Sequence, residues 1–99
     1  MNMQKLMQEA QKMQRELMKK QEEIEKTNYE GKSSLVDVTL NGKKEVVKIN
    51  INLEEDIKLE DKEMLEDMIM LAFNEASKKV DADIETKLGS YGKGIPGLF

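Results

Sequence analysis

The stretch that decides the fold is LVDVTLNGKKEVVKININL, residues 35–53, where apolar and polar side chains alternate on both sides of an Asn-Gly pair. Alternation with a period of two is typical of strands that are buried on one face. Asn-Gly between two such runs is a strong hairpin signal, because both residues accept the positive φ angles of a tight turn. The sequence therefore predicts an antiparallel hairpin with strands at 35–40 and 45–53.

The register of this hairpin depends on the turn. A two-residue turn at Asn-Gly would place Val36 opposite Val47 and Val38 opposite Glu45. The apolar side chains of both strands would then share one face of the sheet, namely Val36, Val38, Leu40, Val47, Ile49 and Ile51. We expect this face to be covered and the polar face to be open to solvent.

The segment before the hairpin, residues 3–26, has the period of a long helix. Its apolar residues recur at alternating steps of three and four, which is a heptad seam: Met3, Leu6, Ala10, Met13, Leu17 and Ile24. About three heptads are too few for a stable isolated coiled coil, so the seam needs a second helix, from the same chain or from a partner. Core packing is the expected role of Leu6, Met13 and Leu17.

Three further segments complete the order of elements. Residues 27–33 are a weak candidate for a strand, and residues 60–88 are predicted to form a second helix that follows an acidic run. One face of this helix is apolar and consists of Leu65, Met68, Ile69, Ala72, Phe73, Ala76, Val80, Ile84 and Leu88. Residues 89–99, GSYGKGIPGLF, are too rich in glycine for a helix and are expected to form a flexible tail.

The composition excludes most catalytic chemistry. The 99 residues contain no Cys and no His, which removes thiolate and imidazole metal ligands, most nucleophilic triads and the usual general bases near neutral pH. The acidic run at 54–67 lacks the calcium-loop pattern and its obligatory Gly, so a solvated loop is its expected role. No apolar run approaches the length of a membrane span. We therefore expect a cytoplasmic protein with no enzymatic activity, cofactor, metal site, small-molecule substrate or membrane partner.

Charge is distributed unevenly along the chain. The net charge is −4, but residues 1–20 carry five cations against two acids, a local +3, whereas residues 54–67 carry a local −6. Glu9 and Glu16 each lie three or four residues from a cation of the same helix, and such pairs partly neutralise one another. Of these cations, only Arg15 has no acid at either spacing. Two interpretations stay open: a salt-bridged solvent face, which composition alone favours, or contact with nucleic-acid phosphates.

Several specific sequence motifs resemble those of a known family. DKEMLEDMIMLAFNEASKKV (61–80), LVDVTLNG (35–42) and IPGLF (95–99), preceded by the Met/Gln-rich LMQEAQKMQRELMKKQEEIE, closely resemble the YbaB/EbfC family of bacterial nucleoid-associated proteins. The resemblance covers almost the whole chain. It implies an α+β subunit of order α-β-β-β-α, with one domain at 1–88, and a tweezers-like homodimer joined through its sheets. It also implies binding of double-stranded DNA in the nucleoid with low sequence specificity, and no enzymatic activity.

The local charge of +3, the apolar patterns and the resemblance together indicate roles for particular residues. Phosphate contacts are expected from the first helix and, secondarily, from the second: Lys5, Lys12, Arg15, Lys19, Lys20, Lys78 and Lys79. Dimer or helix packing is expected from Leu6, Met13, Leu17, Val36, Val38, Val47 and Ile49. The chain departs from the family pattern in two places. A short GKSS (31–34) replaces a longer glycine-rich stretch, and the acidic ININLEEDIKLE (49–60) replaces the usual turn after the last strand.

A competing hypothesis is a protein-interaction module that does not bind nucleic acid. Met7 and Met18 lie outside the strict seam, and methionine side chains adapt to many partner surfaces. Ion pairs between Lys and Glu residues three or four apart along the first helix would leave little free positive charge for DNA. A stoichiometric protein partner that resists nuclease treatment would favour this hypothesis.

Overall fold

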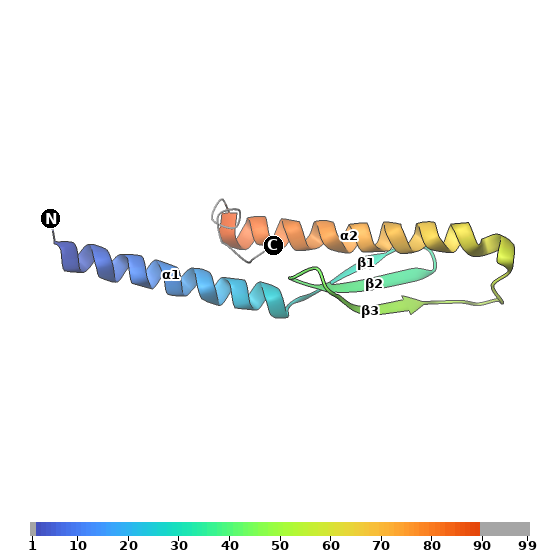
Figure 1. Ribbon diagram of the computed structural model, residues 1–99, viewed down its shortest axis with the longest axis horizontal. Coiled ribbons are helices and arrows are strands. Elements are labelled where there is room, and N and C mark those ends of the chain that lie inside the picture. The colour runs from blue at the N-terminus through green and yellow to red at the C-terminus, as the bar shows by residue number, and fades with distance from the viewer. Residues whose placement is uncertain (1, 90–99) are drawn as a thin grey trace.

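The computed structural model describes residues 2–89 and has the predicted order of elements (Figure 1). The elements are α1 (Met3–Lys26), β1 (Asn28–Lys32), β2 (Val36–Asn41), β3 (Val46–Ile51), a short helical turn η1 (Leu59–Asp61) and α2 (Lys62–Leu88). The α+β fold class, with two long helices and a small antiparallel sheet, is therefore confirmed. Apart from Gly89, the predicted tail lies outside the described residues.

α1 begins where Asn2 supplies a side-chain cap. The Asn2 Oδ1 accepts hydrogen bonds from the backbone N–H groups of Gln4, at 3.1 Å, and Lys5, at 3.4 Å. This cap satisfies two of the N–H groups that a helix leaves without an internal partner. The helix ends at Thr27, whose extended backbone leads directly into β1.

The three strands form an antiparallel sheet in the order β1-β2-β3. Val36 lies opposite Ile51 and Val38 opposite Ile49, whereas the two-residue turn predicted partners four residues earlier on β3. The predicted register is therefore wrong. At Val36 and Val38 the displacement is even and keeps the faces unchanged, so Ile49 and Ile51 still share the apolar face with these two residues. The register shifts by one residue between Thr39 and Leu40, and Leu40 pairs with Val46.

A longer turn explains this register. The Asn41 N–H donates to the carbonyl of Glu45 and the Lys44 N–H donates to the carbonyl of Asn41, both at 3.0 Å. The Asn41 side-chain oxygen also accepts hydrogen bonds from the backbone N–H groups of Lys43, at 2.9 Å, and Glu45, at 3.1 Å. Lys44 takes a φ of 62°, the left-handed conformation that closes a three-residue hairpin loop. The asparagine caps the loop amides, so Asn-Gly begins a longer turn.

The core lies between the sheet and α2. It contains the side chains of Ile24, Tyr29, Val36, Val38, Leu40, Ala72, Ala76, Val80, Ile84 and Leu88. Four more members of the predicted apolar face of α2 are partly buried against it: Leu65, Met68, Ile69 and Phe73. Gly31 on β1 permits the close approach of α2, because a Cβ atom there would overlap the backbone oxygen of Ala72. Small residues on both elements thus set the distance between helix and sheet.

β3 lies outside the cover that α2 provides. α2 packs along β1 and β2, and no comparable contact with β3 is found in the described chain. The apolar side chains of β3 consequently keep between 39% and 53% of their surface exposed: Val46, Val47, Ile49 and Ile51. Val36 and Val38, by contrast, are buried beneath a helix of their own chain. A single subunit therefore covers its apolar sheet face over only two of the three strands.

The subunit has the shape of a rod. Its extents are 71 × 18 × 17 Å and its radius of gyration is 19.2 Å, whereas a compact chain of this length would have a radius of about 13 Å. Figure 1 shows the cause, since α1 continues past the end of α2 and stands clear of the sheet. Residues 2–16 are exposed on every side of the helix. We call residues 2–16 the arm.

Candidate nucleic-acid interface

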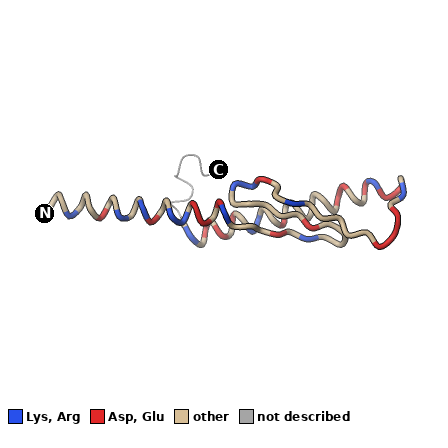
Figure 2. The backbone as a smooth tube through the Cα atoms, turned by 90° about the horizontal axis from the view of Figure 1, so that it is seen from below, with Lys and Arg blue, Asp and Glu red and all other residues tan. Residues whose placement is uncertain are grey.

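The five predicted DNA-binding cations of α1 are all exposed. At about 100° per helical residue, Lys5, Lys12 and Lys19 form one row along the axis, with Arg15 on one side of the row and Lys20 on the other. Figure 2 shows Lys and Arg recurring along α1, while acidic residues gather in the loop between β3 and α2. The structure therefore brings the five cations together on one helix and separates them from the acidic loop.

The acids of α1 do not pair with these cations. The ion pairs in the described part of the chain lie on the sheet, the hairpin turn and α2: Lys32–Glu30, Lys44–Asp81, Lys62–Glu66, Lys79–Glu75 and Lys87–Asp83. Within residues 2–89, the expected ion pairs between Lys and Glu along α1 are thus not formed. Exposed pairs gain little, because holding two long side chains together costs conformational entropy. The positive charges of α1 stay free for another anion.

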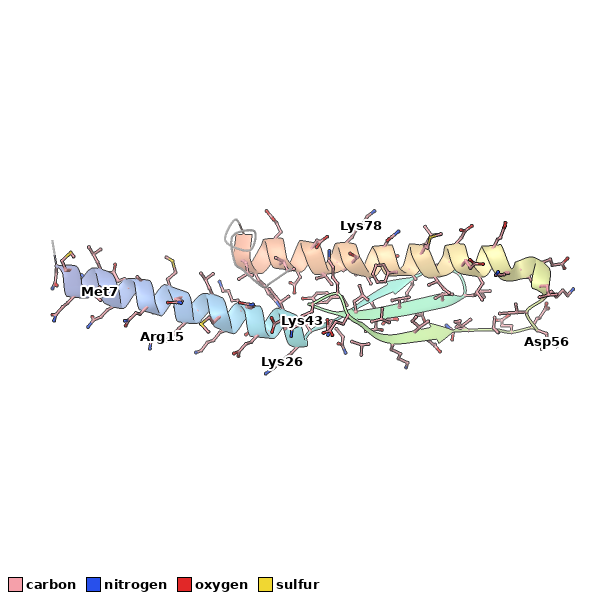
Figure 3. The ribbon with its side chains drawn as sticks, viewed as in Figure 1. Met7, Arg15, Lys26, Lys43, Asp56 and Lys78 are labelled. Atoms are coloured by element: carbon pink, nitrogen blue, oxygen red, sulfur yellow. The ribbon has the colours of Figure 1, made fainter. Side chains whose placement is uncertain are left out.

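The two candidate lysines of α2 differ in their availability. The Lys79 Nζ donates to the carbonyl of Glu30 at 2.6 Å and lies 3.4 Å from the Glu75 carboxylate, so it already ties α2 to β1. Lys78 is exposed. Figure 3 shows Lys78 and Arg15 pointing to opposite sides of the molecule. Within one subunit, the structure does not bring the α2 lysines to the cations of α1.

The heptad seam of α1 is only partly packed. Leu17 is partly buried against the core, but Leu6 remains 46% exposed and Met13 51% exposed. The prediction that these two side chains pack on the second helix of the same chain is wrong, because α1 extends beyond the end of α2 (Figure 1). Their packing against a second subunit stays a prediction.

Two glutamines of α1 belong to the candidate interface although neither was predicted as a site residue. Gln11 and Gln14 line a shallow hollow on the helix surface together with Arg15 and Met18. The available signal was glutamine repeated at helical spacing beside an arginine. Glutamine carries no charge, so a search for phosphate-binding residues passes over it.

A second polar cluster ties β1 to α2. The Tyr29 hydroxyl donates to the Asp83 carboxylate, and the Lys87 Nζ lies 3.0 Å from the same carboxylate. Burial, the hydrogen bond to Asp83 and the charge of Asp83 raise the pKa of Tyr29 to about 12, against a smaller lowering by a hydrogen bond with Thr27. Burial raises the pKa of Asp83, but the hydrogen bonds from Tyr29 and Lys87 and the charge of Lys87 together lower it. These groups satisfy one another, so their role is structural.

The acidic loop at the opposite end of the rod forms a pocket. Leu35 and Leu53 contribute to its apolar part, and Glu54, Glu55 and Asp56 are among its acidic lining residues. In the described part of the chain, no group of three or more side chains is arranged to hold a metal ion. The loop places negative charge far from α1 (Figure 2), so it does not neutralise the cations there.

Comparison with known proteins identifies the family to which a chain with this fold and charge distribution belongs. A sequence model of the YbaB/EbfC DNA-binding family matches residues 1–95. The chain belongs to this family. The YbaB/EbfC family consists of nucleoid-associated DNA-binding proteins without enzymatic activity. Within residues 2–89, no helix combines the length and apolar character that crossing a membrane requires.

Relatives match this YbaB/EbfC chain over nearly its whole length. A nucleoid-associated protein of Xylella fastidiosa is 45% identical over 102 residues, which cover 99% of this chain and 93% of the relative. One of Lactococcus lactis is 42% identical over 98 residues, with 97% and 98% covered. The crystal structure of an uncharacterized Helicobacter pylori protein has a TM-score of 0.70 at 30% identity, and the match covers 87% of this chain and 91% of that one. The fold is therefore shared with a solved structure.

Proposed function

We propose that this YbaB/EbfC protein is a homodimer that binds double-stranded DNA with low sequence specificity, through phosphate contacts made by α1. The observation that carries the proposal is the set of five exposed cations on α1, none of which forms an ion pair in the described chain. Membership of a DNA-binding family supports the same conclusion. Its place of action would be the nucleoid in the cytoplasm.

The mechanism is electrostatic. Each Lys or Arg that neutralises a phosphate releases a condensed counterion, and this release favours binding whatever the base sequence. The net charge of −4 would by itself repel DNA, but screening limits the reach of exposed charges to about 10 Å at moderate salt. Because the acidic loop lies at the other end of a rod 71 Å long, DNA at α1 experiences mainly the local positive charge.

Dimerisation would double this positive surface. The uncovered apolar face of β3 is the proposed contact, with Ile49 47% exposed and Val47 53% exposed in the single subunit. β3 is also an edge strand, so its outer backbone groups are available to pair with another strand. Covering these side chains with a second copy would remove apolar surface from water. Two α1 helices would then project from one joined sheet.

The test reverses charge on α1 and compares it with an equal reversal elsewhere. In the double variant Arg15→Glu and Lys19→Glu, two cations become anions that repel the phosphates, so affinity for a labelled duplex should fall by at least about tenfold. Fluorescence anisotropy at low salt measures the affinity, and light scattering checks that the dimer persists.

The matched control is Lys58→Glu with Lys62→Glu. It changes net charge by the same amount near the start of α2, at the end of the rod opposite α1. It should bind DNA within about threefold of the wild type, because charges far beyond a Debye length are screened. Equal binding by the wild type and the α1 variant would refute the assignment of α1. An equal loss in both variants would show that net charge alone controls binding.

A second candidate function rests on the exposed methionines of the arm and of its continuation in α1. Met7 is 61% exposed and Met18 54% exposed, and adaptable apolar side chains suit a protein partner. If the wild-type protein binds no duplex even at low salt, the proposal of DNA binding fails. α1 would then be a docking surface for a protein.

A further inference from the structure

The chain contains a single arginine, Arg15, beside fifteen lysines. It lies on exposed α1 and is the one cation of that helix without an acid three or four residues away. Lysine is sufficient for neutralising phosphates, since its ammonium acts as a point charge. Arginine differs because its planar fork of N–H groups makes two parallel hydrogen bonds to one partner. A lone arginine at this position therefore suggests a role beyond charge.

Glutamines share the helical stripe of Arg15. Gln4, Gln8 and Gln11 precede it at steps of four, three and four residues, so the four side chains lie within about 60° of one another around the helix axis. All are exposed, and Gln11 and Arg15 line the same shallow hollow. Lys19 lies about 40° from Arg15, at the edge of the stripe nearest the row of lysines. A stripe of amide and guanidinium groups thus runs beside the row of lysines.

This pairing of stripes matches the chemistry of a major groove. Arginine forms a bidentate contact with the O6 and N7 atoms of guanine, and glutamine forms one with the N6 and N7 atoms of adenine. The groove is about 12 Å wide and admits one helix, and the arm is exposed on every side. With the glutamine stripe directed at the bases, the lysine row beside it faces one phosphate wall.

We propose that α1 lies in the major groove and reads base edges weakly, with Arg15 contacting a guanine and Gln11 an adenine of the neighbouring base pair. The inference rests on the proposed DNA binding and adds a short sequence preference to it. Side chains three or four residues apart on a groove-bound helix contact successive base pairs. A preference of two adjacent pairs carries little information, so overall specificity remains low.

The test separates base reading from phosphate binding. Wild-type protein selects from a library of short randomised duplexes, and anisotropy then compares the selected duplex with a scrambled one. We expect a G·C pair next to an A·T pair and a preference of about tenfold. Arg15→Lys keeps the charge but loses the fork, so it should bind the scrambled duplex as before and lose the preference at the G·C pair. Gln11→Ala should lose it at the A·T pair only.

Lys12→Ala is the matched control for phosphate contact. It should weaken both duplexes equally and reduce the slope of log affinity against log salt by about 0.9 for each lost contact. Binding by the wild type without any preference, or an unchanged preference in Arg15→Lys, would overturn the inference and leave the proposed function standing. No binding to either duplex would instead overturn the proposed function.

Discussion

At the scale of single residues, the cluster of Tyr29, Asp83 and Lys87 shows how one polar contact holds two elements together. The Tyr29 side chain is 8% exposed and its hydroxyl reaches the Asp83 carboxylate from β1. Lys87 completes the cluster from one turn further along α2. The Tyr29 hydroxyl can donate to the Asp83 carboxylate only while it keeps its proton. Once ionised, it would place a second negative charge beside that carboxylate. The contact should therefore make the stability of the fold decrease at alkaline pH.

The sign of this pH dependence follows from the raised pKa of Tyr29, about 12 in the folded chain. Below about pH 10, tyrosine is protonated in both the folded and the unfolded chain, and its contribution is fully present. As pH rises from about 10 towards 12, the unfolded chain ionises first, so the free energy of unfolding falls. Tyr29→Phe should lose about 1 kcal/mol at neutral pH and show a shallower alkaline fall. Urea denaturation followed by circular dichroism, at about pH 8 and about pH 11, measures both. An alkaline fall as steep as that of the wild type would contradict the assignment.

At the scale of elements, β3 and the arm are the parts that a single subunit leaves uncovered. Small residues allow α2 to pack closely over β1 and β2. In this position the helix does not cover β3. Similarly, α1 is longer than the surface available to it, so Leu6 and Met13 stay about half exposed. Exposed apolar side chains that gather on one strand mark an interaction surface more often than scattered ones do.

Ile49→Asp tests the role of β3. Ile49 is 47% exposed in the subunit, so a carboxylate there should leave the fold intact. In a dimer joined through β3 the same charge would be buried without a partner, at a cost of several kcal/mol. Light scattering should find a dimer for the wild type and a monomer for the variant, with unchanged circular dichroism.

The control for β3 is Asn50→Asp, which places the same charge on the opposite face of the same strand. It should remain a dimer. A dimeric Ile49→Asp variant would place the subunit contact elsewhere, and a monomeric wild type would remove the dimer from the proposed function.

At the scale of the whole molecule, the subunit is a rod with opposite charges towards its two ends. The cations of α1 lie at one end and the acidic loop between β3 and α2 lies at the other (Figure 2). This separation lets an acidic protein approach a polyanion with one end. The net charge describes solubility better than it describes the surface that meets DNA.

The number of phosphate contacts is measurable from salt dependence. If the four candidate lysines of one α1 helix each neutralise a phosphate, log affinity for duplex DNA should fall against log salt with a slope of about −3.6. Both helices of a dimer on one duplex would make the slope steeper. Anisotropy titrations across a salt series provide the slope, and a value near zero would exclude phosphate contact as the source of binding.

Much of the local structure was predictable from the sequence because it depends on neighbouring residues. The helical period of residues 3–26, the strand alternation around Asn-Gly and the apolar face of α2 all follow from side-chain spacing. The candidate cations of α1 were predictable in the same way, since they lie on one helix. The hairpin register was not predictable from spacing. It depends on the type of turn, which the hydrogen bonds of the Asn41 side chain select, and an Asn-Gly pair is compatible with several turn types.

By itself, the sequence determined the helices, the strands, the apolar face of each element and the separation of charge along the chain. Only the tertiary structure decided which of those faces are covered. Gly31 lets α2 settle over β1 and β2, and that placement leaves β3 and the arm without cover. The physical reason is that the spacing of apolar residues along the chain specifies which side of an element is apolar. Whether that side is buried depends on the packing of a segment that is distant in the sequence.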